Sequence, residues 1–177
     1  YEPFIRQSAG LGKAPEDRDV DTYEHFHAFC DVLVIGGGVA GLEAARTAGR
    51  YGARVILVEQ TAHWGGRAPV DGGSVDGGSV DDHISRTLEE LEGMENVTLR
   101  LRTMGAGIYD HGYALAYERL TDHAPEAAGP RHRLWRIRAG HIITATGSIE
   151  RPLSFAGNDI PGVMLASAVR DYAVNFG

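Results

Sequence analysis

The sequence predicts an α/β fold whose core is a doubly wound, mostly parallel sheet. Residues 32–35 and 54–58 are short runs rich in β-branched residues, which is typical of parallel strands buried on both faces. Between them, residues 39–51 carry apolar and small side chains at helical spacing, and a glycine-rich turn at residues 36–41 opens that helix. These segments together have the length of a right-handed βαβ crossover, so we expect a Rossmann-like sheet.

Composition narrows the classes of function. The chain has 177 residues, with 17 Lys and Arg against 24 Asp and Glu, a formal net charge of −7 and a pI of about 5.6. This charge repels nucleic acid and anionic membrane surfaces, so we expect neither as a partner. The single cysteine, Cys30, can close no disulfide within the chain, and no apolar run reaches the ~18 residues that cross a bilayer. We therefore expect a cytoplasmic protein.

The N-terminal part of the chain lacks the regular hydrophobic pattern of the segments that follow. Residues 1–30 hold glycines, prolines and an acidic run without sustained periodicity, which indicates an N-terminal arm. The folded domain is expected to begin at Asp31 and to occupy residues 31–177. Its first helix should end at Gly52, where a left-handed cap would follow the last turn.

A tandem pentapeptide follows the second strand, with Asp-Gly-Gly-Ser-Val at residues 71–75 and again at residues 76–80. Its glycines and its shortness predict a flexible surface loop, and it lacks the ligand spacing of calcium-binding loops. Residues 83–94 then show helical periodicity and residues 96–101 are strand-like. Another helix and strand therefore extend the sheet.

The pattern changes to antiparallel β-structure between residues 104 and 138, which predicts an antiparallel β-insert. Its β-rich runs lie at residues 107–109, 113–117 and 134–138. Residues 141–147 are then predicted to form one more buried strand of the parallel sheet. A helical pattern begins at Leu165 and is cut off at Gly177, so we expect a domain truncated at its C-terminus.

The turn after the first strand has the pattern Gly-x-Gly-x-x-Gly and opens a helix. The first glycine permits the tight turn, the second lets backbone approach a pyrophosphate, and the third lets helix and strand pack closely. Phosphate is favoured there by the free amides and the positive end of the helix. We therefore predict a dinucleotide-binding domain of the FAD or NAD type. The predicted phosphate-binding residues are Gly36, Gly38, Val39, Ala40 and Gly41.

Glu59 lies eighteen residues after Gly41, at the tip of the second strand, where a carboxylate can accept from both hydroxyls of the adenosine ribose. Its charge would repel a 2′-phosphate, which disfavours NADP. Gln60 is included in the predicted site. Gly65-Gly66 recurs at this place in flavoproteins, so NAD and FAD both stay open; the alternative is a loop entrance without a ligand. Arg67 could reach a phosphate or pair with surface acids.

Other candidates are less specific. Ala145, Thr146 and Gly147 follow a later strand and are predicted to line the dinucleotide. Trp64 either covers a cofactor ring or packs within its loop. The eight histidines lack the spacing of metal ligands, so no metal site is expected, and the sequence assigns no catalytic residue.

These motifs resemble known families. The glycine turn, Glu59 with Gly65-Gly66, and residues 145–147 resemble the two-dinucleotide-binding-domain flavoprotein superfamily. A more specific set spans nearly the whole chain and resembles the alpha subunits of heterotetrameric sarcosine oxidases, although the tandem pentapeptide departs from that pattern. This set comprises Tyr1-Glu2-Pro3-Phe4-Ile5-Arg6, Tyr23-Glu24-His25, Cys30-Asp31-Val32-Leu33-Val34, Ile149-Glu150-Arg151-Pro152, Gly157-Asn158-Asp159 and Pro161-Gly162-Val163-Met164.

The resemblance implies part of a complex that demethylates sarcosine oxidatively to glycine, formaldehyde or a methylene-folate, and peroxide. In that family the alpha subunit carries NAD and a folate-binding C-terminal region, whereas FAD and a covalent FMN belong to the beta subunit or its interface. By analogy this chain would hold NAD, have the beta and smaller subunits as partners, and not be catalytic alone. Two alternatives stay open: an FAD-binding domain of a different pyridine-nucleotide-dependent flavoprotein oxidoreductase, and a non-catalytic scaffold that its nucleotide stabilises.

Overall fold

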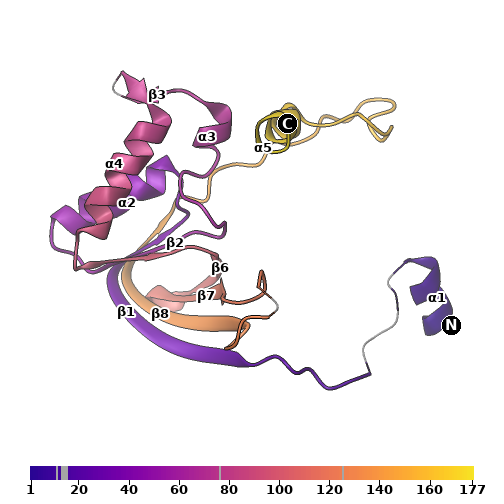
Figure 1. Ribbon diagram of the computed structural model, residues 1–177, viewed down its shortest axis with the longest axis horizontal. Helices are drawn as coiled ribbons and strands as arrows, with labels where there is room; N and C mark the ends of the chain where they lie inside the picture. The colour runs from indigo at the N-terminus through magenta and orange to yellow at the C-terminus, as the bar shows by residue number, and fades with distance from the viewer. Residues whose placement is uncertain (11, 13–15, 76, 125) are drawn as a thin grey trace.

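The computed structural model describes residues 1–177 except 11, 13–15, 76 and 125. Its main element is a six-stranded sheet with the strand order β5-β2-β1-β8-β7-β6 (Figure 1). The strands of this sheet are β1 (Tyr23–Ile35), β2 (Val55–Val58), β5 (Val97–Arg100), β6 (Thr103–Tyr109), β7 (Tyr113–Arg119) and β8 (His132–Thr144). The helices are α1 (Glu2–Ser8), α2 (Val39–Arg50), α3 (Ala68–Asp71), α4 (Val80–Glu92) and α5 (Ala166–Asn175).

One half of the sheet is parallel and the other is antiparallel. Strands β5, β2, β1 and β8 run parallel, and β8, β7 and β6 pair antiparallel. Helices α2 and α4 pack together against the parallel half (Figure 1). The expected α/β fold, a Rossmann-like parallel sheet with an antiparallel β-insert, is therefore confirmed.

Two apolar clusters hold the layers together. The first lies between α2, α4 and the parallel strands and includes Val34, Leu42, Leu57 and Leu91. The second lies on the other face of the sheet, where side chains of β1 and β2 meet those of β7 and β8. The antiparallel strands β6, β7 and β8 belong to the same sheet, which curves so that they cover the face of β1 and β2 that the helices leave open (Figure 1). They supply the third layer of the fold.

Strand β1 begins at Tyr23, eight residues before the expected start of the folded domain. Residues 23–30 pair with β8 along their whole length, so they belong to the sheet. Phe26 lies beside Trp135 yet is 43% exposed, Phe29 on the opposite face is 69% exposed, and only Cys30 among residues 23–30 is buried. A search for continuously apolar, buried strands passes over this segment because it is largely exposed and mixes apolar with polar residues.

Strand β8 is continuous where the sequence predicts two separate strands. Its first half pairs with both β7 and β1, and its second half pairs with β1. The expected burial of residues 141–147 is wrong, since Ile143 is 38% exposed and Thr144 is exposed. The reason is that β7 ends its pairing at Arg138, so the last residues of β8 lie at the edge of the sheet.

The tandem pentapeptide is more ordered than a flexible loop. Strands β3 (Ser74–Val75) and β4 (Gly78–Ser79) form a small antiparallel pair, and α4 starts directly after it. Ser79 caps this helix, because its hydroxyl accepts a hydrogen bond from the Asp82 amide at 3.1 Å. Asp76, in the second copy of the repeat, lies outside the described residues.

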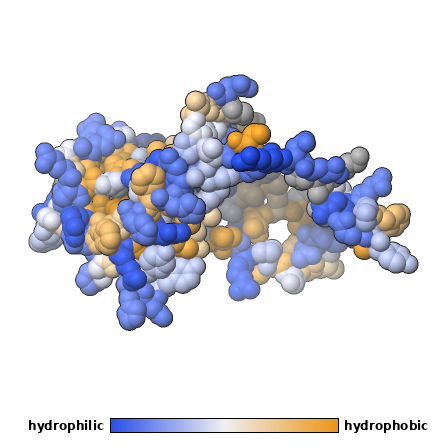
Figure 2. Space-filling view, turned by 90° about the horizontal axis from the view of Figure 1, so that it is seen from below, coloured by the Kyte–Doolittle hydropathy of each residue, from blue (hydrophilic) through white to orange (hydrophobic). Residues whose placement is uncertain are grey.

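The two ends of the chain lie away from the sheet. Figure 1 shows α1 remote from the body of the fold and α5 at the end of a long extended segment. Apolar and hydrophilic side chains are intermixed over the face shown in Figure 2. Within the part of the chain that the structure describes, none of the helices has the length and apolar character that crossing a membrane requires.

Candidate functional site

The predicted glycine turn lies at the carboxyl end of β1, where ligands bind in open parallel sheets. Gly36 has a φ of +108°, and a Cβ on it would lie 2.3 Å from the Ala145 carbonyl oxygen. The Ala145 amide in turn donates to the Ile35 carbonyl at 2.8 Å. The turn is therefore pressed against the end of β8, which brings Ala145 beside it.

Helix α2 begins immediately after the turn, with Gly38 as its N-cap and no side-chain cap. The first hydrogen bond back to the cap is Leu42 N–H to the Gly38 carbonyl, at 2.9 Å. The amides of Val39, Ala40 and Gly41 precede that bond, so they lie among the free donors at the positive end of the helix. A Cβ on Gly38 would meet only the Gly65 carbonyl oxygen, at 4.0 Å. The backbone at Gly38 is thus open to an approaching group.

Gly65 and Gly66 lie against the glycine turn of residues 36–38. The Gly65 amide donates to the Gly37 carbonyl at 2.8 Å, and Gly38 and Gly65 form an isolated parallel bridge. A Cβ on Gly66 would stand 3.2 Å from the Gly38 Cα. The two glycine-rich segments, 27 residues apart between Gly38 and Gly65, therefore form one cradle of backbone that carries no side chains.

Glu59 is 6% exposed and follows β2 directly. One carboxylate oxygen accepts from the Gly37 amide at 2.6 Å, and the other accepts from the Thr61 amide at 2.8 Å. The sequence anticipates a carboxylate facing ribose hydroxyls, whereas here it also fastens the glycine turn to the loop after β2. Each oxygen keeps a second lone pair, so these bonds leave acceptor capacity for a ligand hydroxyl.

The loop after Glu59 is braced by the corner between β5 and β6. The Thr103 amide donates to the Glu59 carbonyl at 2.7 Å, and the Arg102 amide donates to the Thr61 carbonyl at 2.8 Å. Gln60 is exposed, and its carbonyl accepts from the Arg119 guanidinium at 2.8 Å. Hydrogen bonds to the carbonyls of all three residues 59–61 therefore hold the backbone around Glu59 in place.

Arg67 pairs with acids, which is one of the two roles that the sequence left open. Its guanidinium donates to Asp171 of α5 at 2.8 and 3.1 Å and to Asp71 at 3.3 Å. It lines a cavity of about 590 Å³ between α3 and α5, which the segment after Gly147 also lines. Thr146 and Gly147 are exposed where the chain leaves β8.

Several residues of this cavity are not anticipated by the sequence. Arg170 contacts Asp71, and the Ser167 amide donates to Glu150 at 2.9 Å. Hydrogen bonds from Ser167 hold the pKa of the Glu150 carboxyl below its usual value. The sequence carries no local signal for these contacts, because Arg67 and Asp171 are 104 residues apart.

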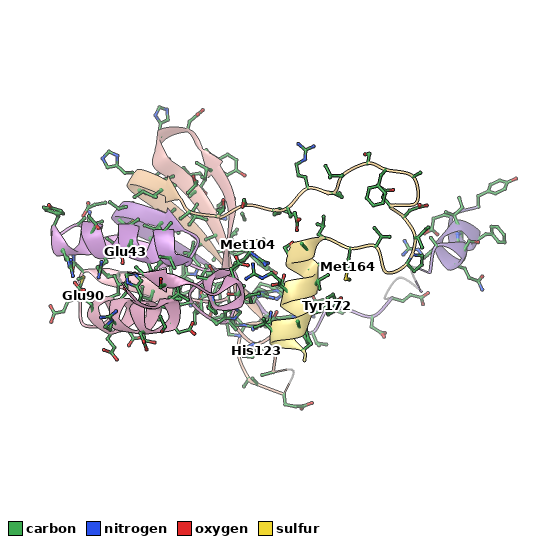
Figure 3. The ribbon with its side chains drawn as sticks, turned by 90° about the horizontal axis from the view of Figure 1, so that it is seen from above. Glu43, Glu90, Met104, His123, Met164 and Tyr172 are labelled. Atoms are coloured by element: carbon green, nitrogen blue, oxygen red, sulfur yellow. The ribbon has the colours of Figure 1, made fainter. Side chains whose placement is uncertain are left out.

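A second charged cluster lies on the helix layer, apart from the glycine cradle. Arg46 of α2 pairs with Glu43 at 2.5 Å and with Glu90 of α4 at 3.8 Å, and Arg50 also contacts Glu90. Figure 3 shows Glu43 and Glu90 close together, on the side of the molecule opposite to Met164 and Tyr172. These charges link α2 to α4. Within the described ranges, His, Cys, Asp and Glu side chains form no group of three that could hold a metal ion.

Comparisons with known proteins identify a family and several relatives of this chain. Residues 30–174 match a family model described as pyridine nucleotide-disulphide oxidoreductase. Sarcosine oxidase subunit alpha of Rhizobium meliloti (strain 1021) is 50% identical over 100% of this chain and 18% of its own length. The protein of the same name from Corynebacterium sp. (strain P-1) is 44% identical over 95% of this chain and 18% of its own length. The predicted resemblance is therefore confirmed.

A solved structure shares the fold. The L-proline dehydrogenase from P. horikoshii superposes with a TM-score of 0.66 and 26% sequence identity, over 91% of this chain and 31% of that one. The present chain spans about a fifth of the length of these two sarcosine oxidase alpha subunits, at 18% of each.

Proposed function

Since the chain belongs to the pyridine nucleotide-disulphide oxidoreductase family, we propose that it is the NAD-binding segment of an oxidoreductase subunit. The observation that carries this proposal is the cradle in which Gly65 and Gly66 lie on the turn of Gly36 to Gly38. Backbone amides and the N-terminus of α2 meet there without a side chain in front of them. A pyrophosphate is the group that such a cradle suits.

The roles of the individual residues follow from their positions. The amides at the start of α2 would hold the pyrophosphate, and Glu59 would accept from the adenosine ribose while it keeps the Gly37 amide in place. Its carboxylate disfavours a 2′-phosphate. Residues 145–147 would border the other side of the turn, against Gly36. Once bound, NAD accepts or donates a hydride.

We extend the proposal to the whole protein on the basis of its relatives. Proteins named sarcosine oxidase subunit alpha match nearly the whole chain at 42–50% identity. The proposed reaction is the oxidative demethylation of sarcosine by a cytoplasmic complex. Beta and smaller subunits would be the partners, with FAD and FMN in the beta subunit or at its interface. The present segment, with residues 31–177 as its dinucleotide domain, would bind nucleotide without being catalytic alone.

The identity of the nucleotide is tested on the full-length protein, purified with its partner subunits. The alpha subunit is first separated from its partners in its folded state and then denatured, and the nucleotides that it releases are identified by mass spectrometry. NAD in a ratio of one per alpha subunit is the expected result. Recovery of FAD without a nicotinamide nucleotide would show that the cradle binds the flavin. The contact of Gly65 and Gly66 with the glycine turn suits that assignment as well. Recovery of neither would contradict a dinucleotide site.

A substitution at Gly38 tests where the nucleotide lies. Gly38 has a φ of −71°, and a Cβ there meets no protein atom closer than 4.0 Å, so Gly38→Ala should fold normally. The added methyl would stand where the pyrophosphate must approach, and we expect the bound nucleotide to be lost or reduced about tenfold or more. Gly93→Ala is the matched control, because Gly93 has a φ of −75° and lies at the C-terminus of α4. Equal nucleotide content in both variants would place the ligand elsewhere.

A further inference from the structure

Trp64 lies against two residues of the proposed site. A Cβ built on Gly37 would stand 2.4 Å from the Trp64 Cε3 and 2.7 Å from its Cζ3. The same point is 2.9 Å from the Cβ of Glu59. The indole ring therefore occupies the space that a side chain at position 37 would need, and it shares that space with the side chain of Glu59.

The loop that carries Trp64 is fixed to the turn. The residue after it, Gly65, donates its amide to the Gly37 carbonyl at 2.8 Å. Within the loop, the Thr61 hydroxyl donates to the His63 carbonyl at 2.8 Å. Trp64 is half-buried and packs against the apolar cluster under the helices, so its ring is held in place before any ligand arrives. Such preorganisation lowers the entropy that binding costs.

The chemistry of adenosine places its base beside this ring. The base is joined directly to the ribose, so a ribose held by Glu59 brings adenine next to the Glu59 side chain, where the indole lies. Aromatic rings stack on nucleobases, and each stacked base contributes about 1–3 kcal/mol to binding. We propose that Trp64 is the stacking platform for the adenine base of the dinucleotide. This inference rests on the proposed function, because it takes Glu59 as the ribose acceptor.

A role confined to packing makes different predictions. If Trp64 only fills the space beside Gly37, any apolar side chain of similar volume would serve. If it stacks on adenine, an aromatic ring is required. Trp64→Phe keeps a ring, whereas Trp64→Leu keeps an apolar side chain without a ring. Trp64→Met offers a second ringless side chain that adapts to irregular space, should the leucine variant fail to fold.

The experiment uses the full-length protein freed of its bound nucleotide and titrated calorimetrically with AMP and with ribose 5-phosphate. These probes share the ribose and its 5′-phosphate, and they differ at the anomeric carbon, which carries adenine in AMP and a hydroxyl in ribose 5-phosphate. For Trp64→Leu or Trp64→Met we expect about 5- to 150-fold weaker binding of AMP and unchanged binding of ribose 5-phosphate. Trp64→Phe should bind AMP nearly as the wild type does. Equal melting temperatures show that the variants are folded.

Two outcomes would overturn the platform while leaving the proposed function intact. One is wild-type AMP affinity in a ringless variant. The other is an equal loss for both probes, which would show that Trp64 acts only by holding Glu59. Failure of the wild-type protein to bind AMP, together with the absence of a co-purifying dinucleotide, would instead contradict the proposed function and this inference with it.

Discussion

The three glycines of the Gly-x-Gly-x-x-Gly pattern differ in what they are needed for. Gly36 is required by the fold, since it has a positive φ and presses on the Ala145 carbonyl. Gly41 is also required by the fold, because a Cβ there would stand 1.8 Å from the Gly36 carbonyl oxygen. Gly38 alone among the three has room for a side chain. Its lack of one is therefore the feature that points to a ligand.

This contrast gives a prediction for Gly41→Ala. The added methyl overlaps backbone rather than a flexible side chain, so we expect a destabilisation of about 1–3 kcal/mol or more. The urea midpoint of the variant should fall clearly below that of Gly38→Ala. Similar midpoints for the two variants would show that the turn adapts, and would remove the distinction between structural and ligand-facing glycines.

Asp31 gives a prediction about pH. Its carboxylate accepts from the Arg54 amide and guanidinium at 2.8 Å each, and these bonds lower its pKa from 3.8 to about 2. Because the folded pKa lies below the unfolded one, the stabilisation is present above the unfolded value of 3.8 and is lost as the pH falls from there through about 2. We expect Asp31→Asn to be less stable than the wild type at pH 7.

Urea titrations at pH 7 and pH 2 check this expectation. The difference between Asp31→Asn and the wild type should shrink at pH 2, where the wild-type carboxyl is becoming protonated. A difference that stays the same at both values would mean that the contribution of Asp31 does not depend on its charge.

At the scale of elements, the two copies of the pentapeptide have different structures although their sequences are the same. Ser74 lies in the short strand β3, whereas Ser79 caps α4. The difference arises from the residues on the C-terminal side of each copy. Asp81 and Asp82, after the second copy, favour the first turn of a helix, whereas the first copy is succeeded by another glycine-rich copy.

The cap predicts an asymmetric response to substitution. Ser79→Ala removes the acceptor of the Asp82 amide and should cost about 1 kcal/mol of stability. Ser74→Ala is the matched control, because it changes the same residue of the other copy, and its effect should stay within about 0.5 kcal/mol. Chemical denaturation of both variants measures the difference. Equal effects would contradict the capping role of Ser79.

At the scale of the whole molecule, β8 joins the two halves of the sheet. Ile137 is 1% exposed and pairs with Ala28 of β1 and Ala114 of β7. Its side chain belongs to the apolar cluster between the parallel sheet and the antiparallel insert. The two halves therefore share one core and should unfold together.

We expect Ile137→Ala to lower the stability by about 2–5 kcal/mol. Far-UV circular dichroism and tryptophan fluorescence should give the same urea midpoint, since both report one transition. Ile143→Ala is the control on the same strand, where the side chain is 38% exposed and the cost should be smaller. Two separate midpoints in the variant would show that the insert unfolds independently of the parallel half.

The sequence predicted those parts of the fold that depend on local pattern. The βαβ unit, the glycine turn and the antiparallel insert were all readable from periodicity and turn residues. The early start of β1 was not, because only Cys30 of residues 23–30 is buried and the segment therefore has the pattern of an exposed one. The continuity of β8 was not readable either, since the change of pairing partners along one strand leaves no mark in its sequence.

For the site, the sequence singled out Gly36, Gly38, Gly41 and Glu59 by their spacing. Tertiary structure alone decided that Glu59 also fastens the Gly37 amide, that Trp64 packs on Gly37, and that Arg67 pairs with Asp171. The cause is the range over which each kind of interaction acts. Strand, helix and turn preferences act between neighbours in the chain, whereas these contacts join residues 22, 27 and 104 positions apart, which only the folded sheet and its helices bring together.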